Sequence, residues 1–249
     1  MNYLLKEDPD VARIIQQEEA RIENTLDLIA AENHAPRSIL EAQGSIFSTK
    51  AAEGYPGHRF HAGCIFADEL ESLAIKRAQR LFGADYANLQ PHSGVSANLA
   101  VYFSVLNVGD RILSMKLSHG GHLSHGDPSS VTSQCFHFKH YGLDAQTEQI
   151  DYDEMRDMAR AFKPQMIIAG ASSYPRLIDY QLTTDIAKSV SAYLLVDMAH
   201  IAGLVAAGVI PSPVPHADFV TFTTYKTLKG GRGGMIPVSY THLTLPTTD

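Results

Sequence analysis

The sequence has very little cysteine and no tryptophan. Its 249 residues include two cysteines, Cys64 and Cys135, which are too few for a disulfide framework and favour a reducing cytoplasm. The lack of tryptophan by itself excludes nothing. No apolar run approaches the roughly 18 residues of a membrane-spanning helix. Residues 1–9 also lack the basic and apolar regions of a secretory signal. We therefore expect a cytoplasmic protein without a membrane segment.

Positive charge is scarce as well. The chain carries 20 Lys and Arg against 27 Asp and Glu, a formal net charge of -7. This balance argues against a general nucleic-acid binder and against attraction to an anionic membrane surface. A hydrophobic fraction of 45% and a charged fraction of 19% are ordinary for a globular protein. The length allows one large domain with an appended arm.

The first part of the chain predicts helices and a long loop. Between Asp8 and Ile29, apolar residues recur at mixed three- and four-residue intervals, which predicts an amphipathic helix. We interpret residues 1–30 as a helical arm that needs a surface to pack against. Pro36 predicts the start of a second helix, which continues to about Gln43. Residues 50–63 contain Gly54, Gly57 and Gly63 and predict a long functional loop.

Beyond the loop, the pattern predicts alternating helices and strands. Helices are expected at 67–82, 94–106, 154–162 and 184–191, and strands at 86–89, 111–115, 166–169, 193–196 and 219–223. Because the strands include near-continuous apolar runs, residues 31–238 predict an α/β domain with a mostly parallel sheet flanked by helices. Residues 239–249 have neither a helical pattern nor a helix cap. An edge strand and a sequence foreign to the domain both fit that tail.

Two polar residues follow neighbouring apolar runs. Asp197 ends one predicted strand, and Lys226 follows the next, just before a glycine-rich segment. Singly, such an aspartate usually caps a helix and such a lysine usually lies on the surface. One right-handed crossover between the two strands would place both residues at one sheet edge, where α/β folds bind ligands. Pyridoxal 5'-phosphate requires such a pair: an amine for its aldehyde and a carboxylate for its pyridine nitrogen.

Two further motifs fit an anionic, aromatic ligand. Ser93-Gly94 precedes a predicted helix, where backbone N–H groups and a hydroxyl form either an anion site or a plain N-cap. His119, His122 and His125 recur at three-residue spacing, which could suggest a metal site. Two intervening glycines favour a loop instead, and no acidic residue follows as in H-E-x-x-H. We therefore expect no metal and favour an imidazole that stacks on the cofactor ring.

Together these segments resemble the serine hydroxymethyltransferase (glycine hydroxymethyltransferase) family, which has the fold-type-I, aspartate aminotransferase-like architecture. The resemblance runs in order from about Leu28 to Ile236. The matching segments are LIAAEN (28–33), AEGYPG (52–57), QPHSG (90–94), HGGHL (119–123), AGASSYPR (169–176), VDMAHIAGLV (196–205), PSPVPHAD (211–218) and YKTL (225–228). The resemblance implies a pyridoxal-phosphate enzyme that interconverts serine and glycine with tetrahydrofolate as one-carbon carrier. It also implies a homodimer whose subunits share active sites.

The resemblance implies a role for individual residues. Those expected at the cofactor are Lys226 (the Schiff base), Asp197 (the pyridine nitrogen), His122 (ring stacking), His200 and Ser172 (the phenolic oxygen), Ser93 and Gly94 (the phosphate), and Tyr225, which stands where the family has a histidine. Those expected at the substrate or folate are Glu53, Leu117, Gly121, Leu123 and Arg232. Glu53 would be the acid/base at the substrate hydroxyl, with a pKa raised by burial.

Several substrate-facing positions depart from the family pattern. This chain has Ala31 where the family has a serine, and Ala51 and His61 where the family has tyrosines. The family's Ser-Gln pair that follows Ser-Gly is replaced by Val95-Ser96. Each change removes a polar group worth about 1–3 kcal/mol at a buried site. Family members also continue well past residue 249, so the large domain is expected to be truncated at its C-terminus. Three interpretations stay open: the one-carbon transferase, which we favour, a folate-independent enzyme for other β-hydroxy amino acids, and a non-catalytic fragment.

Overall fold

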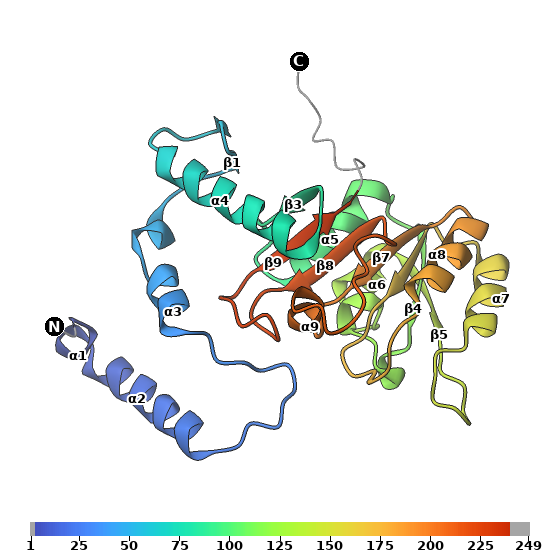
Figure 1. The fold of residues 1–249 in the computed structure, drawn as a ribbon, viewed down its shortest axis with the longest axis horizontal. Coiled ribbons are helices and arrows are strands. Elements are labelled where there is room, and N and C mark those ends of the chain that lie inside the picture. Colours follow the sequence, from blue (N-terminus) through green and yellow to red (C-terminus); the bar gives the residue numbers. More distant parts are fainter. Residues whose placement is uncertain (1–2, 240–249) are drawn as a thin grey trace. The chain divides into compact units, whose positions relative to one another are not determined.

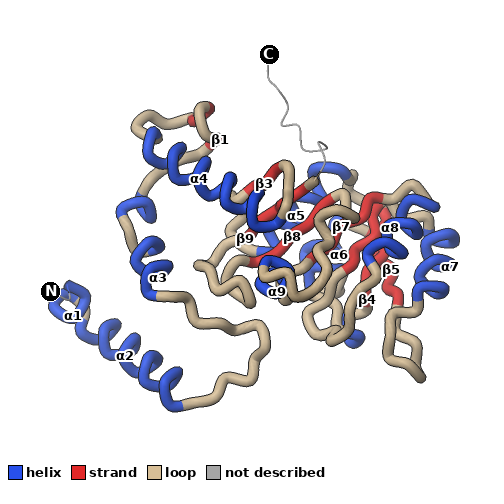
Figure 2. The backbone as a smooth tube through the Cα atoms, in the orientation of Figure 1, coloured by secondary structure: helices blue, strands red, loops and turns tan. Residues whose placement is uncertain are grey.

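The protein is described by a computed structural model that covers residues 3–239. The chain divides into two compact units, Met1–Glu32 and Asn33–Asp249. Figure 1 shows the order of the elements along the chain, and Figure 2 shows strands gathered in the second unit with helices around them. The functional residues predicted from the sequence all belong to the second unit.

The first unit consists of two helices, α1 (Tyr3–Glu7) and α2 (Pro9–Asn24). The Asp8 carboxylate caps α2 by accepting a hydrogen bond from the Val11 N–H at 3.1 Å, and Pro9 occupies the first turn, where it displaces no helical hydrogen bond.

The predicted extension of this helix to Ile29 is wrong. Asn24 Nδ2 donates to the Ala20 carbonyl and Thr25 Oγ1 donates to the Arg21 carbonyl, so side chains replace the next backbone donors and the chain turns extended at Thr25. Leu26, expected on the apolar stripe, is 92% exposed.

A seven-stranded sheet lies at the centre of the second unit, with the order β3-β9-β8-β7-β6-β4-β5. Its strands are β3 (Tyr86–Asn88), β4 (Arg111–Met115), β5 (His137–Tyr141), β6 (Met166–Ala169), β7 (Tyr193–Asp197), β8 (Phe219–Thr223) and β9 (Gly234–Val238). The five strands from β5 to β8 run parallel, whereas β9 is antiparallel to both of its neighbours. The predicted mostly parallel sheet is confirmed.

Helices cover both faces of this sheet (Figure 1). These helices are α4 (Ile65–Phe82), α5 (Gly94–Val105), α6 (Val131–Cys135), α7 (Tyr152–Phe162), α8 (Tyr180–Ser189) and α9 (Ala202–Ala206), with short 3-10 turns η2 (Leu117–His119) and η3 (Leu123–His125). Helix α3 (Arg37–Gln43) and the 3-10 turn η1 (Ile46–Thr49) precede α4, and α3 has no buried residue. Alternate strand residues enter two separate cores: Leu194 and Val196 pack with α7, α8 and α9, while Leu195 packs with α5. Both faces are therefore buried, which accounts for the continuous apolar runs.

The segment predicted as a long loop contains a small hairpin, β1 (Gly54–Tyr55) and β2 (His58–Arg59). The tail set apart in the sequence, residues 239–249, lies outside the described residues except for Ser239, whose hydroxyl donates to the Val214 carbonyl at 2.9 Å. Across residues 3–239, no helix is both long and apolar enough to cross a bilayer.

Candidate active site

A pocket opens at the carboxyl ends of β7 and β8. It is lined by Ser93, Gly94, Val95, His122, His125, Ala171, Ser172, Asp197, Ala199, His200, Thr223, Tyr225 and Lys226. All eight residues predicted to surround the cofactor are in this set. The sheet produces this convergence, because β7 and β8 are parallel neighbours with Asp197 opposite Thr221. Lys226 follows β8 by three residues and so reaches the same edge as Asp197.

Asp197 is the most constrained side chain of the pocket. Its Oδ2 accepts hydrogen bonds from Asn98 Nδ2 at 2.9 Å and His125 Nε2 at 3.0 Å, and its Oδ1 accepts one from the Ala199 N–H at 3.0 Å. Burial opposes ionisation, but His125, Asn98 and the Ala199 N–H outweigh it, so the Asp197 pKa lies well below its ordinary range. Three of about four acceptor positions of this carboxylate are used, which leaves one on Oδ1.

Lys226 is a buried lysine without a hydrogen-bonded carboxylate partner among the described residues. Burial lowers the pKa of its amine, and the charge of Asp197 opposes that shift only in part. A lowered pKa increases the neutral fraction of the amine near pH 7, and only the neutral amine can attack an aldehyde.

Two histidines face the same space. His122 Nδ1 accepts from the Ser124 N–H at 3.2 Å and lies 2.8 Å from Ser124 Oγ, which holds the ring in place. Burial, with the nearby His125, lowers the His122 pKa. Burial, with the nearby Lys226, lowers the His200 pKa to about 4. Both imidazoles are therefore neutral at physiological pH and suited to stacking or hydrogen bonding.

The N-terminus of α5 forms a second polar end of the pocket. Ser93 and Ser96 make a capping box, in which Ser93 Oγ accepts from the Ser96 N–H at 3.2 Å and Ser96 Oγ accepts from the Ser93 N–H at 2.8 Å. A Cβ on Gly94 would lie 2.7 Å from Thr223 Cγ2, so only glycine lets the helix end approach β8 this closely. Thr223 Oγ1 is buried and has no hydrogen-bond partner in the described structure.

These features fit pyridoxal phosphate. The unpartnered Thr223 hydroxyl and the exposed N–H groups of a helix start suit a phosphate dianion. The remaining acceptor position of Asp197 suits a pyridinium N–H, and the amine of Lys226 suits an aldehyde carbon. The pocket therefore places on one chain residues suited to three parts of the cofactor: the phosphate, the pyridine nitrogen and the aldehyde.

The acid/base predicted from the resemblance lies elsewhere. Glu53 does not line this pocket: its side chain is 66% exposed, and its Oε2 lies 2.7 Å from His61 Nε2. The expected rise of its pKa by burial is wrong for this structure, because its own backbone N–H and the nearby His61 lower that pKa. The family pattern leads us to expect a tyrosine at position 61; here the His61 imidazole pairs with the Glu53 carboxylate instead.

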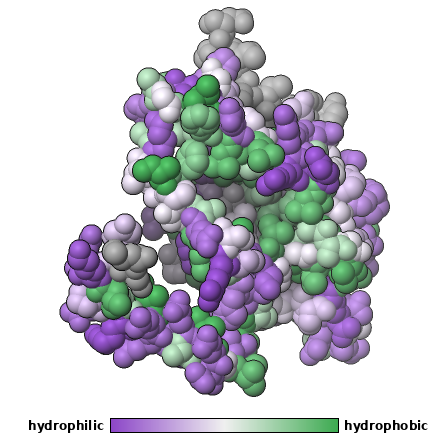
Figure 3. Space-filling view, turned by 60° about the vertical axis from the view of Figure 1, so that its left-hand side comes forward, coloured by the Kyte–Doolittle hydropathy of each residue, from purple (hydrophilic) through white to green (hydrophobic). Residues whose placement is uncertain are grey.

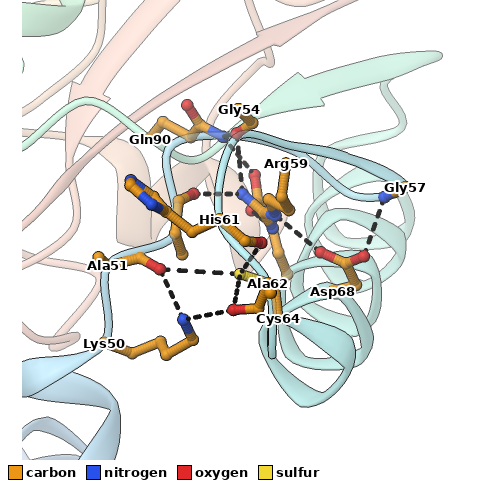
Figure 4. Close-up of polar contacts among 12 residues, drawn as sticks. Lys50, Ala51, Gly54, Gly57, Arg59, His61, Ala62, Cys64, Asp68 and Gln90 are labelled. Atoms are coloured by element: carbon orange, nitrogen blue, oxygen red, sulfur yellow. Dashed lines mark hydrogen bonds and ion pairs between the residues drawn. The ribbon is translucent and has the colours of Figure 1, made fainter.

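Arg59 anchors the loop that carries Glu53 (Figure 4). Arg59, whose side chain is only 5% exposed, forms ion pairs with Asp68 at 2.7 Å and Glu71 at 2.6 Å and donates to the carbonyls of Ala52 and Gly54. A guanidinium fork used in this way holds both ends of the hairpin on α4. Partly buried ion pairs and hydrogen bonds therefore fix the position of this loop on α4.

The other substrate-side residues do not line the pocket. Leu117 and Leu123 are exposed on η2 and η3, and Gly121 lies between them, where a Cβ would meet the Met115 carbonyl at 2.5 Å. Arg232 is exposed and its guanidinium carbon lies 4.2 Å above the Tyr225 ring, a cation–π contact.

His119, His122 and His125, which recur at three-residue spacing, each bond a different partner. His119 Nδ1 accepts from the Leu143 N–H at 2.9 Å, whereas His125 bonds Asp197 and His122 bonds Ser124. Within the part of the chain that the structure describes, no group of three or more His, Cys, Asp or Glu residues could hold a metal ion.

Among the polar side chains at the site, Asn98, His125 and Thr223 are missing from the sequence-based set. Asn98 is fully buried in an otherwise apolar helix, and that isolation was the available signal. His125 was considered only as a metal ligand, and Thr223 only as the end of a strand.

Most of the chain is similar in sequence to known proteins of one family. The family model described as serine hydroxymethyltransferase matches residues 4–242. A serine hydroxymethyltransferase of Desulforapulum autotrophicum is 58% identical over 229 residues, which is 92% of this chain and 55% of that protein. One of Methanosarcina barkeri is 57% identical over 236 residues, or 95% of this chain and 57% of that protein. The chain thus spans about half the length of these relatives.

Proposed function

Because this chain belongs to the serine hydroxymethyltransferase family, we propose that its pocket binds pyridoxal 5'-phosphate and that the complete protein interconverts serine and glycine with tetrahydrofolate. The observation that carries this proposal is the meeting of Lys226, Asp197 and the unpartnered Thr223 hydroxyl in one pocket. Each of the three would serve a different reactive or charged group of that cofactor.

Each residue of the pocket is assigned to one part of the cofactor. When bound, the cofactor supplies an aldehyde that captures amines and a ring that accepts electrons from the bonds at the substrate α-carbon. Lys226 would hold the aldehyde carbon, and Asp197 would keep a proton on the ring nitrogen. His122 would stack on the ring, while Ser172 and His200 would hydrogen-bond near the phenolic oxygen. The residues proposed to bind the phosphate are Ser93, Gly94, Thr223 and Tyr225.

The substrate side requires more than this pocket. In the proposal, Glu53 moves a proton at the substrate hydroxyl, Arg232 lies near the active site, and Leu117, Gly121 and Leu123 contact folate. Since Glu53 is exposed and outside the pocket, we infer that a second copy of the protein brings its own Glu53 loop to each site. The rigid Arg59 anchor supports such a use, because a loop offered to another chain must keep its shape alone.

The remaining parts follow the same proposal. Residues 1–30 would form an arm that packs on a neighbouring surface, and residues 31–238 the N-terminal portion of the cofactor-binding domain. Free thiols at Cys64 and Cys135 suit a cytoplasmic location.

The test is an absorbance titration of the chain with pyridoxal phosphate, beside the Lys226→Ala variant. We expect a cofactor band that forms in the parent, is lost in the variant, and shifts when glycine is added. A fluorescence or calorimetric titration checks that the variant remains folded. Cleavage of serine that depends on tetrahydrofolate would support the transferase, whereas folate-independent cleavage of other β-hydroxy amino acids would replace it. No band in a folded parent chain would overturn the proposal.

A further inference from the structure

A buried polar chain lies behind Asp197 and has no part in the reaction described above. It links β8, α5, β7 and η3 through Thr221, Asn98, Asp197 and His125. All four residues are buried, and His125 is only 1% exposed. Buried polar groups carry a desolvation cost unless their hydrogen bonds are made, so such a chain is expected where a particular geometry must be held.

The direction of each hydrogen bond is fixed by chemistry. The Asp197 carboxylate needs a donor, so the Asn98 amide must point its Nδ2 toward Asp197 and Ser124; its Oδ1 then accepts from Thr221 Oγ1 at 2.5 Å. An ionised carboxylate only accepts, so His125 Nε2 must donate to Asp197. His125 Nδ1 is buried without a partner among the described residues, so a single hydrogen bond orients this ring.

Both side-chain donors converge on the same oxygen. Asn98 and His125 occupy Oδ2, and the Ala199 N–H takes one position of Oδ1. The carboxylate therefore cannot rotate without breaking buried hydrogen bonds, and its one free acceptor position is on the oxygen that lacks side-chain donors.

We propose that His125, with Asn98, is a positioning residue that holds the Asp197 carboxylate with the free acceptor position of Oδ1 directed at the cofactor's ring nitrogen. This proposal rests on the proposed function, because it concerns the cofactor named there. His125 itself touches neither substrate nor ring nitrogen in this arrangement; its effect passes through Asp197.

A purely structural role is the alternative. The His125 ring lies 5.5 Å from that of His122, centroid to centroid, so loss of His125 could disturb ring stacking as well. A structural defect would weaken every ligand of the pocket. A positioning defect would weaken only ligands that present a ring nitrogen to Asp197.

The experiment compares two ligands on three proteins. The ligands are pyridoxal phosphate and its analogue with the ring nitrogen replaced by carbon, and the proteins are the parent chain, His125→Gln and His125→Leu. A glutamine amide can place a donor near the position of Nε2, whereas leucine cannot. Dissociation constants are measured by absorbance, and folding is checked by thermal unfolding. Should His125→Leu fail to fold, His125→Asn, whose amide is too short to reach Asp197, takes its place.

The expected result is selective. His125→Leu should bind pyridoxal phosphate about 10- to 100-fold more weakly, the range for a lost hydrogen bond to a charged group, and the carbon analogue about as well as the parent does. His125→Gln should stay within about 3-fold of the parent for both ligands. Equal weakening of both ligands, or of neither, would overturn the positioning role while leaving the proposed function intact. A folded parent chain that binds neither ligand would overturn both.

Discussion

His200 makes the folding stability of the protein depend on pH. It follows β7 at the pocket and is partly buried beside Lys226, and its pKa is lowered to about 4 from an ordinary value of 6.5. In the unfolded chain the imidazole takes up a proton near pH 6.5, while in the folded chain it does so only near pH 4. Between these values the unfolded state binds more protons, so folding stability must fall as the pH is lowered.

We therefore expect the free energy of unfolding to drop by about 2 kcal/mol for His200 alone between pH 7 and pH 4.5. His122 and His140, whose pKa values are also lowered by burial, change in the same direction. Asp197 adds little in this window, because its ionised form is retained to lower pH. Urea unfolding at several pH values, with His200→Gln for comparison, measures the effect. Parallel pH profiles for the two proteins would contradict it.

At the scale of single residues, all eight residues predicted at the cofactor line one pocket. Lys226, Asp197 and Ser93 are adjacent to strand ends or a helix start, which a hydrophobic pattern indicates, whereas the role of His122 was predicted from the family resemblance. Asn98 could not be assigned a partner, because it contacts Asp197 across 99 residues of sequence. The exposure of the Glu53 side chain could not be predicted from the sequence either, because the exposure of a loop side chain depends on which surface the loop packs against.

Among the elements, α5 and β8 lie very close together where the phosphate is proposed to bind. Gly94 opens α5, and a Cβ at this position would lie 2.7 Å from Thr223 Cγ2. The φ of Gly94 is not in the left-handed region, so the requirement for glycine is one of space alone.

Gly94→Ala should consequently destabilise the fold by about 1–3 kcal/mol, the usual cost of overpacking, although alanine is the better helix former. Thr223→Ser removes the opposing methyl group and keeps the hydroxyl. We expect the Gly94→Ala/Thr223→Ser double variant to recover most of the lost free energy of unfolding in a urea titration. A double variant no more stable than Gly94→Ala would show that the contact with Thr223 is not the cause.

The elements themselves were predicted unevenly. Strands β4, β6, β7 and β8 follow the expected apolar runs, because both of their faces are buried. Strand β5 (His137–Tyr141) was missed: it is the edge strand, its exposed and half-buried residues alternate, and its sequence HFKHY carries little apolar signal. Strand β9 was missed for another reason, since Gly234 and Pro237 are residues that usually mark turns. Helix α8 starts at Tyr180 rather than Thr184, because Asp179 caps it through the Leu182 N–H at 2.8 Å.

For the whole molecule, the exposed apolar surface of α4 is the main unexplained feature of the second unit. Ile65, Phe66, Leu70 and Leu73 are all exposed on this helix. Leu70 and Leu73 also border an apolar groove formed with Leu81, Phe82, Leu89, Leu228 and Met235. Figure 3, in which the side carrying α4 comes forward, shows apolar side chains gathered at the surface. Continuous apolar areas of this kind are typical of interfaces.

We expect the chain to self-associate at micromolar concentration, and Leu73→Glu to weaken that association by about tenfold or more, because a charge would enter an apolar contact. Val209→Glu, at another exposed apolar position (69% exposed, against 45% for Leu73) far along the chain, is the control and should leave association unchanged. Sedimentation velocity over a concentration series measures both. A parent chain that sediments as a monomer throughout would contradict the expectation, as would equal effects of the two substitutions.

The pairing of β7 with β8 has a consequence for how relatives of this chain should be recognised. Asp197 and Lys226 meet because Asp197 lies opposite Thr221 in the sheet, whatever the length of chain that joins the two strands. That connection includes an exposed turn at residues 207–209, where extra residues would extend into solvent without moving either strand end. Homologues can therefore diverge in the number of residues between the two groups and still share their chemistry. A sequence profile that allows gaps at this turn will recover relatives that a fixed-spacing motif discards.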